Sequence, residues 1–371
     1  MNASIRIGKI AGIPVGLHFS WFLIFALLTW SLSSAYFPQE YPQLSGWLYV
    51  LLAAVTSIFF FASVLAHELG HSIIALRNQI PVKGITLFIF GGVAQIGQEP
   101  RSPGAEFRIA IAGPLVSLGL AGIFGLLWVV DHGIPYLAAP SIYLARINLI
   151  LALFNMIPGF PLDGGRVLRS IVWWFTKSFR KATQVASVSG QLVAFGFIAF
   201  GVFLLFQGNL ANGLWLAFIG WFLQNAAAAT YAQMNLQESL SGVKVSQVMT
   251  SDCQQVQSLT PISQIVDERI LTGGQRCFFV ADEDELKGIL TLKDISKLAQ
   301  PKWRFTTAEQ LMVPFSRLIK IDPDMELMTA LQAMDQAEVA QIPVVEQGRI
   351  TGMLTREQVL HYLRLRAELG I

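Results

Sequence analysis

The pentapeptide His67-Glu68-Leu69-Gly70-His71 lies near the end of an apolar run that extends from Trp47 to Leu76. As a helix this run would be roughly 45 Å long, whereas the hydrocarbon core of a bilayer is about 30 Å thick. We therefore predict a membrane-spanning helix whose last turns enter a protein-lined or water-filled space. Ionisable side chains at such depth are functional candidates, because hydrocarbon offers them no partners.

The composition of the whole chain also indicates a membrane protein. Of its 371 residues, 53% are hydrophobic and 13% are charged, whereas soluble domains usually contain about 25% charged residues. Before Lys244 there are 12 basic and 7 acidic residues, and from Lys244 onward there are 14 and 17. This rise in the number of charged residues at Lys244 predicts a membrane-embedded first part and a soluble second part. The net charge of +2 provides no broad basic surface for a nucleic acid.

Six runs are long and apolar enough to cross a membrane. They cover residues 17–37, 47–76, 107–130, 140–175, 186–206 and 209–231. All basic residues before Lys244 except Arg146 fall on one side of these predicted spans, and such residues usually face the cytoplasm. We therefore predict a multi-pass integral membrane protein, in the cell membrane if the source is bacterial, with both termini in the cytoplasm.

The two cysteines, Cys253 and Cys277, both lie in the predicted soluble part. They form no CxxC pair and no disulfide-scaffold pattern. We expect them to be free thiols in a reducing compartment.

The pentapeptide has the spacing of a zinc site. In a helix, His67 and His71 lie one turn apart on the same face, where two imidazoles can hold one Zn²⁺ ion. Glu68 lies beside them, and a carboxylate there can take a proton from water and pass it to the departing amine of a peptide bond. The same pentapeptide occurs by chance in soluble proteins. Inside an apolar helix, however, one zinc ion per chain is the simplest compensation for burying these groups.

A second carboxylate within the predicted spans, Asp163, belongs to the segment Asn155-Met156-Ile157-Pro158-Gly159-Phe160-Pro161-Leu162-Asp163-Gly164-Gly165. Its prolines and glycines cannot continue a regular helix, and broken backbone at membrane depth is tolerated only against protein or a wet cavity. A catalytic zinc usually has three protein ligands, so Asp163 is the natural candidate for the third. The alternative is a structural cap within the break.

These two motifs together resemble the signatures of the site-2 protease family, the intramembrane zinc metalloproteases of the peptidase M50 type. The resemblance covers most of the first 235 residues. It implies that His67, His71 and Asp163 bind zinc and that Glu68 is the catalytic base. It further implies that Asn155 helps to position the substrate or the transition state. The chain shows no PDZ-like insert and is similar to the branch of the family that carries CBS domains.

Two further features lie near these motifs. Residues 82–96 are rich in strand formers on both sides of Gly91-Gly92, which indicates a hairpin directly after the zinc helix. An exposed strand edge there can hold an unfolded substrate by β-addition, and a purely structural hairpin is the equal alternative. His18 opens the first span, and we do not expect it to be a zinc ligand.

The soluble part repeats itself about every 60 residues and looks like a tandem pair of CBS domains. Each repeat ends in a strand, a turn and a helix, at Gly288-Ile289-Leu290-Thr291-Leu292-Lys293-Asp294 and again from Gly352 to Gln358. The resemblance implies binding of ATP, ADP or AMP, with Gly288, Thr291 and Asp294 at the site, and a homodimer through these domains. Gln358 stands where the second repeat would need the aspartate, which puts that second site in doubt. The alternative is a purely structural or dimerising pair.

The predicted fold is thus a polytopic α-helical membrane protein with about six spans and a small β element, followed by a soluble α/β CBS pair. The predicted parts are a protease domain at 1–235, a linker at 236–244 and CBS domains at 245–305 and 306–371. The predicted function is a metalloendopeptidase that cleaves transmembrane proteins in regulated intramembrane proteolysis. A membrane transporter with a CBS pair explains the architecture but not the two zinc motifs. The intact Glu68 argues against a catalytically silent scaffold.

Overall fold

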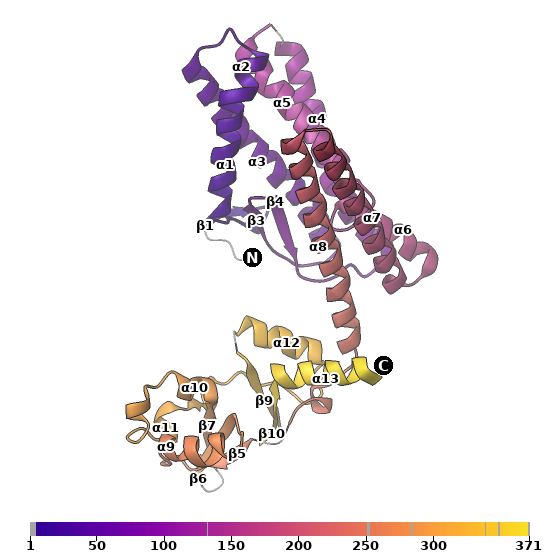
Figure 1. Cartoon of the computed structure of the whole chain (residues 1–371). Helices are drawn as coiled ribbons and strands as arrows, with labels where there is room; N and C mark the ends of the chain where they lie inside the picture. The colour runs from indigo at the N-terminus through magenta and orange to yellow at the C-terminus, as the bar shows by residue number, and fades with distance from the viewer. Residues whose placement is uncertain are drawn as a thin grey trace. The chain divides into compact units, whose positions relative to one another are not determined.

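The apolar runs of the first part form long helices in the computed structural model (Figure 1). The structure describes residues 5–131, 133–250, 253–282, 285–337, 339–347 and 349–369. The outer limits of the predicted domains, at residues 1 and 371, lie outside these ranges. The chain divides into two compact units, Met1–Met234 and Asn235–Ile371.

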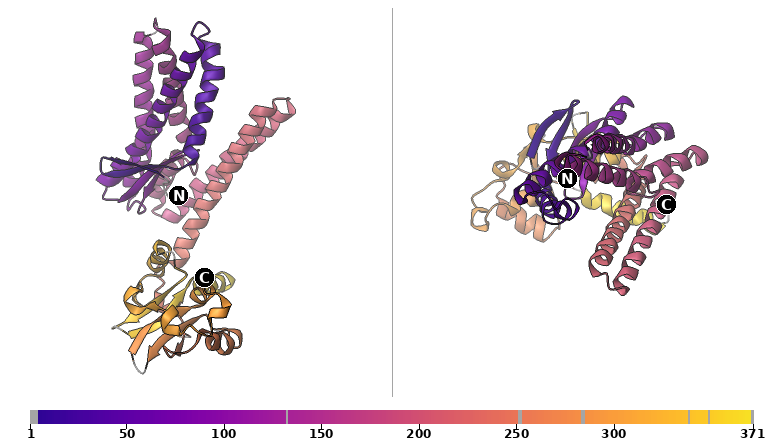
Figure 2. Two further views of the ribbon diagram at one scale, coloured as in Figure 1. Left: turned by 90° about the vertical axis from the view of Figure 1, so that its left-hand side faces the viewer. Right: turned by 90° about the horizontal axis from the view of Figure 1, so that it is seen from above.

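The first unit is mainly helical. Its helices are α1 (Ser20–Ser31), the π-helical turn η1 (Leu32–Tyr36), α2 (Phe37–Glu40), α3 (Gly46–Arg77), α4 (Pro103–Asp131), α5 (Pro135–Asn155), α6 (Asp163–Thr176), α7 (Phe179–Phe206) and α8 (Leu210–Leu240). Within the described residues, five segments are long and apolar enough to cross a membrane: Ser20–Glu40, Gly46–Arg77, Pro103–Asp131, Pro135–Asn155 and Phe179–Phe206. The sixth predicted span, 209–231, falls within α8 except for its first residue, and α8 runs antiparallel to α7 (Figures 1 and 2).

The predicted break in the fourth span is confirmed. Helix α5 ends at Asn155, and α6 begins only at Asp163. The irregular segment between them packs against α7, where the Phe160 N–H donates to the Ala186 carbonyl at 3.1 Å and the Ser189 hydroxyl donates to the Pro158 carbonyl. These bonds satisfy backbone groups that lipid cannot satisfy, which explains how a non-helical segment persists at this depth.

A small sheet lies at one end of α1 and α3 (Figures 1 and 2). Its strands β1 (Ile5–Ile10), β2 (Ile13–Leu17), β3 (Val82–Phe88) and β4 (Gly91–Ile96) are hydrogen-bonded in the order β1-β2-β3-β4. Strands β3 and β4 form the predicted hairpin, with Ile89 and Phe90 in the turn and Gly91 at the start of β4. Because β4 ends the order, one of its edges has no strand partner within the described residues.

The second unit contains the two predicted repeats. The first has strands β5 (Gln254–Val256), β6 (Cys277–Asp282) and β7 (Glu285–Thr291), with α9 (Ile262–Gln264), η3 (Ile265–Leu271) and α10 (Leu292–Ser296). The second has α12 (Leu327–Gln336), β9 (Gln341–Glu346), β10 (Arg349–Thr355) and α13 (Arg356–Leu369). Short elements complete the unit: η2 (Val245–Gln247), η4 (Gln300–Lys302), α11 (Ala308–Leu311), β8 (Val313–Pro314) and η5 (Phe315–Arg317).

The two repeats exchange the segments that open them. Strand β8, which precedes the second repeat, pairs with β7 of the first through Gly288 and Pro314. In the same way Thr250, which precedes the first repeat, pairs with Met353 in β10 of the second. Each repeat also has its own buried core, one around Phe278 and one around Val344. The exchange makes the pair a single folding unit.

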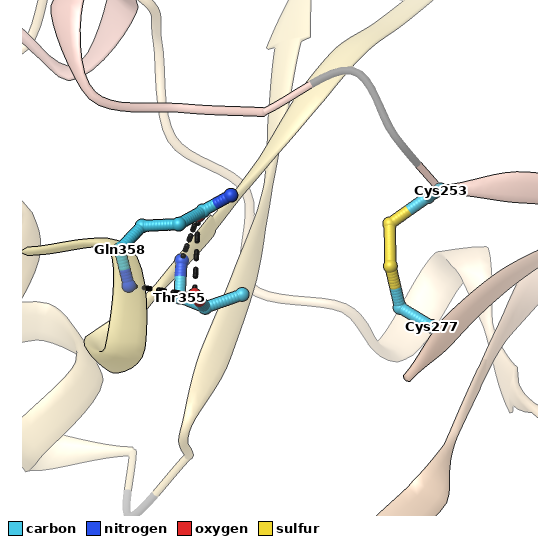
Figure 3. The surroundings of a disulfide bond; sticks show 4 residues. All are labelled: Cys253, Cys277, Thr355 and Gln358. Atoms are coloured by element: carbon cyan, nitrogen blue, oxygen red, sulfur yellow. Dashed lines mark hydrogen bonds between the residues drawn. A yellow bond between two sulfur atoms is a disulfide. The ribbon is translucent and has the colours of Figure 1, made fainter. Parts of the chain in front are cut away.

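The expectation of two free thiols is wrong. Cys253 and Cys277 form a disulfide, with their Cα atoms 5.4 Å apart (Figure 3). Strands β5 and β6 are parallel neighbours with Gln254 opposite Phe278, so the preceding residues, Cys253 and Cys277, are opposite each other as well. A separation of 24 residues conceals this pairing in the sequence, and only the strand register reveals it.

Candidate metal centre

Helices α3 and α6 bring the three predicted ligands together. The Nε2 atoms of His67 and His71 lie 3.2 Å apart, and each lies 3.1 Å from Oδ2 of Asp163. Both histidines are buried, and the Asp163 side chain is 16% exposed. The helical repeat of α3 places both histidines on one face of that helix. The break before α6 allows Asp163, the first residue of α6, to lie next to them.

The three donor atoms fit a zinc ion. Atoms at the corners of a triangle with these edges lie about 1.8 Å from its centre, so a position about 2.0 Å from all three exists just outside their plane, as zinc requires. The Nδ1 of His71 donates to the Ile109 carbonyl at 2.6 Å, which leaves Nε2 of the neutral ring as an acceptor. The Nε2 acceptor of His71 therefore faces a carboxylate oxygen of Asp163 at 3.1 Å, an arrangement of two acceptors that a cation stabilises.

Helix α4 contacts both histidines in ways that the motifs did not reveal. The Ser117 hydroxyl lies 2.9 Å from Nδ1 of His67, and the Ile109 carbonyl accepts the bond from His71. Between these contacts lies Gly113, where a Cβ atom would be 2.6 Å from Nε2 of His67 and closer still to Nε2 of His71. Because Gly113 has no side chain, it leaves room at the donor atoms.

Glu68 is oriented by the hairpin. Its Oε2 accepts a hydrogen bond from the Ala94 N–H of β4 at 3.1 Å. Gly92 lies beside the same side chain, since a Cβ there would be 2.7 Å from Cγ of Glu68. Glu68 also interacts electrostatically with His67, His71 and Asp163. The hairpin thus touches the predicted catalytic base, which sequence spacing alone could not show.

Two other residues of the first unit drew attention in the sequence, Asn155 and His18. Asn155 is the last residue of α5, directly before the break that leads to Asp163. His18 bonds through Nδ1 to the Ser20 hydroxyl at 2.8 Å and is not one of the clustered donors.

In the second unit, a cavity of about 450 Å³ lies between the repeats and is lined by Thr291 and Asp294 together with Lys297 and Arg317. Thr291 caps α10 and donates through Oγ1 to Asp294 at 2.6 Å. Gly288 does not line the cavity, because it packs against the carbonyl of Val313.

The corresponding position of the second repeat makes a similar cap, with the amide of Gln358 in place of the carboxylate of Asp294. There the Gln358 amide oxygen accepts hydrogen bonds from the N–H and the hydroxyl of Thr355, at 3.0 and 3.1 Å (Figure 3). Thr355 and Gln358 thus cap the start of α13 as Thr291 and Asp294 cap the start of α10.

Comparisons with known proteins agree with this arrangement. The sequence profile of peptidase family M50 matches residues 55–142 and 132–198, and the CBS domain profile matches residues 245–300 and 308–365. The chain is 35% identical over 376 residues to sll0528 of Synechocystis sp., which bears the name of a candidate zinc metalloprotease, and the match covers 99% of this chain and 97% of the relative.

The chain is also 33% identical to Rip3 of Mycobacterium tuberculosis, which likewise bears the name of a candidate zinc metalloprotease. This match covers 97% of this chain and 92% of the relative. A solved structure of a site-2 protease from Methanocaldococcus jannaschii matches with 29% identity and a TM-score of 0.42, over 61% of this chain and 94% of that one. Because relatives match over nearly their full length, the chain belongs to the site-2 protease family, peptidase family M50, and is a zinc metalloprotease of the membrane with a C-terminal pair of CBS domains.

Proposed function

We propose that this metalloprotease hydrolyses peptide bonds of transmembrane proteins within the membrane, in regulated intramembrane proteolysis. The observation that carries the proposal is the convergence of His67, His71 and Asp163, with donor atoms 3.1 to 3.2 Å apart, at the end of an apolar helix that is 32 residues long. Polar donors so placed are suited to chemistry on a substrate that is itself embedded in lipid.

Each residue of the cluster has a proposed role. His67, His71 and Asp163 hold one zinc ion, which supplies Lewis-acid chemistry toward water and the scissile carbonyl. Glu68 accepts the proton of the attacking water and returns it to the departing amine nitrogen, as a positioned general base and acid. Asn155, at the end of α5, orients the substrate carbonyl.

The free edge of β4 is the proposed docking site of the substrate chain. The Ala94 N–H donates to Glu68, so it points away from β3 and toward that edge. Alternate residues of a strand share this direction, which adds the N–H groups of Gly92 and Ile96. A substrate strand that pairs with this edge passes beside Glu68. The peptide bonds of such an extended substrate are exposed, whereas those of a helical substrate are hidden.

The charge distribution supports an orientation with the cluster toward the cytoplasm. Arg77 ends α3, six residues after His71, and Arg166 and Arg169 follow Asp163 in α6. Basic residues near span ends face the cytoplasm. We therefore propose that both termini and the CBS pair are cytoplasmic.

Replacement of Glu68 tests the proposed activity. Glu68→Gln keeps the shape of the side chain but removes the base, so zinc content stays normal while cleavage of membrane proteins falls by roughly 100-fold or more. The measurement is a proteomic comparison of membrane proteins cleaved by the wild type, by Glu68→Gln and by the control Glu40→Gln at the end of α2. A Glu68→Gln variant that cleaves within tenfold of the wild type would refute the proposal.

We further propose that the CBS pair regulates the protease by binding an adenine nucleotide. The cavity beside Thr291 and Asp294 supports this, because it offers a hydroxyl and a carboxylate together with the cations Lys297 and Arg317. A carboxylate suits a ribose and the cations suit phosphate groups. We propose one nucleotide site per chain, because Gln358 places a neutral amide where the first repeat has the carboxylate of Asp294.

A further inference from the structure

One face of α4 contacts both histidines of the proposed zinc site and the helix that carries Asp163. Glu106, Ile109, Gly113 and Ser117 follow one another at intervals of three or four residues, which places them on the same side of the helix. Three of them contact the histidines: Ile109 binds His71, Ser117 lies beside His67, and Gly113 leaves room at both Nε2 atoms. The fourth, Glu106, begins this row and contacts α6 instead.

Glu106 is held by the helix that carries Asp163. Its side chain is fully buried, and its Oε1 accepts a hydrogen bond from Nε of Arg169 at 2.6 Å, with Nε of Arg166 at 3.9 Å. Arg166 and Arg169 follow Asp163 by three and six residues, about one and two turns along α6. The side chain of Arg169 is only 5% exposed. Arg169 therefore ties α6 to the face of α4 that contacts both histidines.

Arg169 is itself fixed on other sides. Its guanidinium lies over the ring of Phe160, 5.1 Å from the centroid, and over that of Phe179, at 4.6 Å. Phe160 belongs to the break before Asp163, and Phe179 begins α7. A displacement of Arg169 would therefore move both the break and the start of α6, which together set the position of Asp163.

We propose that Glu106 is a positioning residue of the zinc site, which acts through Arg169 to hold Asp163 in register with His67 and His71. The inference rests on the proposed ligand set. A site built from two helices needs their spacing fixed to within a fraction of an ångström, and support of this kind usually changes metal affinity by 10- to 100-fold. The buried ion pair provides that support between α4 and α6.

The test measures zinc affinity of the full-length protein in detergent by competition with a chelator, together with the visible spectrum of the cobalt-substituted protein. Glu106→Gln is expected to weaken zinc binding by roughly 10- to 100-fold and to alter the cobalt spectrum. Glu99→Gln is the matched control, because Glu99 binds the same arginine at 3.1 Å but its side chain is 56% exposed. It should change zinc affinity less than about threefold, since exposed ion pairs contribute little.

A double variant separates positioning from stability. Loss of Glu106 alone leaves Arg169 buried without its main partner, which can destabilise the fold, whereas Glu106→Gln with Arg169→Gln removes both charges. We expect the double variant to recover thermal stability but not zinc affinity. If it recovers both, or if Glu106→Gln binds zinc as the wild type does, Glu106 has no positioning role. If Asp163→Ala also left zinc affinity unchanged, the proposed ligand set itself would be wrong.

Discussion

At the scale of residues, a single carboxylate oxygen completes the proposed set of zinc ligands. Oδ2 of Asp163 lies 3.1 Å from both imidazole nitrogens, so the same atom completes the contact with each histidine. Asp163→Ala is therefore expected to lower zinc affinity by more than about 100-fold, because the loss of a ligand exceeds the usual effect of a supporting residue.

Zinc content of the purified Asp163→Ala variant, measured by mass spectrometry of the metal, checks this prediction. Asp131→Ala, at the end of α4, is the control and should retain one zinc ion per chain. Full zinc occupancy in Asp163→Ala would assign the third ligand to another residue.

The sequence predicted the residues that cluster at the candidate metal site but not the groups that contact them. His67, Glu68, His71 and Asp163 could be identified because charged groups are rare in apolar runs and their spacing matches a metal site. Ser117, the Ile109 carbonyl and Gly113 carry no such signal, since small residues and backbone groups are common in membrane helices. Their role depends on which face of α4 meets α3, and only tertiary packing decides that.

Some of the helices, strands and turns could be predicted from local sequence, whereas the pairing of distant segments could not. The hairpin at residues 82–96 was predicted from its strand formers, and so was the break before Asp163 from its prolines and glycines. The disulfide could not be predicted, because it depends on the register of β5 against β6 rather than on any local pattern. Local chemistry thus reveals where the chain turns or stops, whereas the pairing of distant segments has to be observed.

The edge of β4 offers a prediction at the scale of elements. Ile96→Pro removes one N–H that points toward the free edge, so substrate binding should weaken and KM should rise several-fold, while zinc content stays unchanged. Ile96 also packs against the cluster around Ala75 and Ile109, so Ile96→Ala is the control that loses packing but keeps the N–H. Equal KM values for the two variants in a cleavage assay would exclude a backbone contact at this position.

We expect a surface carboxylate of the first repeat, that of Asp282, to make the stability of the second unit depend on pH. Nζ of Lys287 lies 2.7 Å from the Asp282 carboxylate. The hydroxyl and the N–H of Ser258 donate to the same carboxylate, at 2.6 and 3.0 Å. The hydrogen bond from Lys287, followed by those from Ser258, holds the pKa of Asp282 below its ordinary value. A carboxyl group with a lowered pKa stabilises the folded state above its unfolded pKa of about 4, and this contribution is lost as the pH falls further.

Thermal unfolding of a fragment that comprises 235–371, which has two buried cores of its own, checks this prediction. The wild type should have a higher Tm than Asp282→Asn, by a constant difference between about pH 5 and pH 7. The difference should shrink below about pH 4, as the carboxylate of the wild type takes up protons. A difference that stays constant down to pH 2.5 would show that the ion pair and hydrogen bonds of Asp282 do not stabilise the fold.

At the scale of the whole molecule, the chain joins a protease of the membrane to a CBS pair through α8. This helix ends at Leu240, so residues 236–240 of the predicted linker are helical, and Leu240 is buried in the core of the second repeat. A change within the CBS pair can therefore act on α8, although a dimer through the CBS domains stays a prediction.

Nucleotide control of cleavage is the prediction that joins the two units. ATP, ADP or AMP should bind full-length protein, and Asp294→Ala should weaken that binding by roughly tenfold or more, because it removes a charged hydrogen-bonding partner. Asp335→Ala is the matched control, since Asp335 pairs with Arg356 on the surface and does not line the cavity. Calorimetry in detergent measures the binding, and cleavage of a membrane substrate measures the response.

Linkage requires reciprocity, so a nucleotide that changes substrate affinity must itself bind differently when substrate is present. If none of the three nucleotides binds at millimolar concentration, or if Asp294→Ala binds as the wild type does, the proposed site is wrong. If a nucleotide binds but neither cleavage nor substrate affinity responds, the cavity is a structural binding site and control of the protease lies elsewhere.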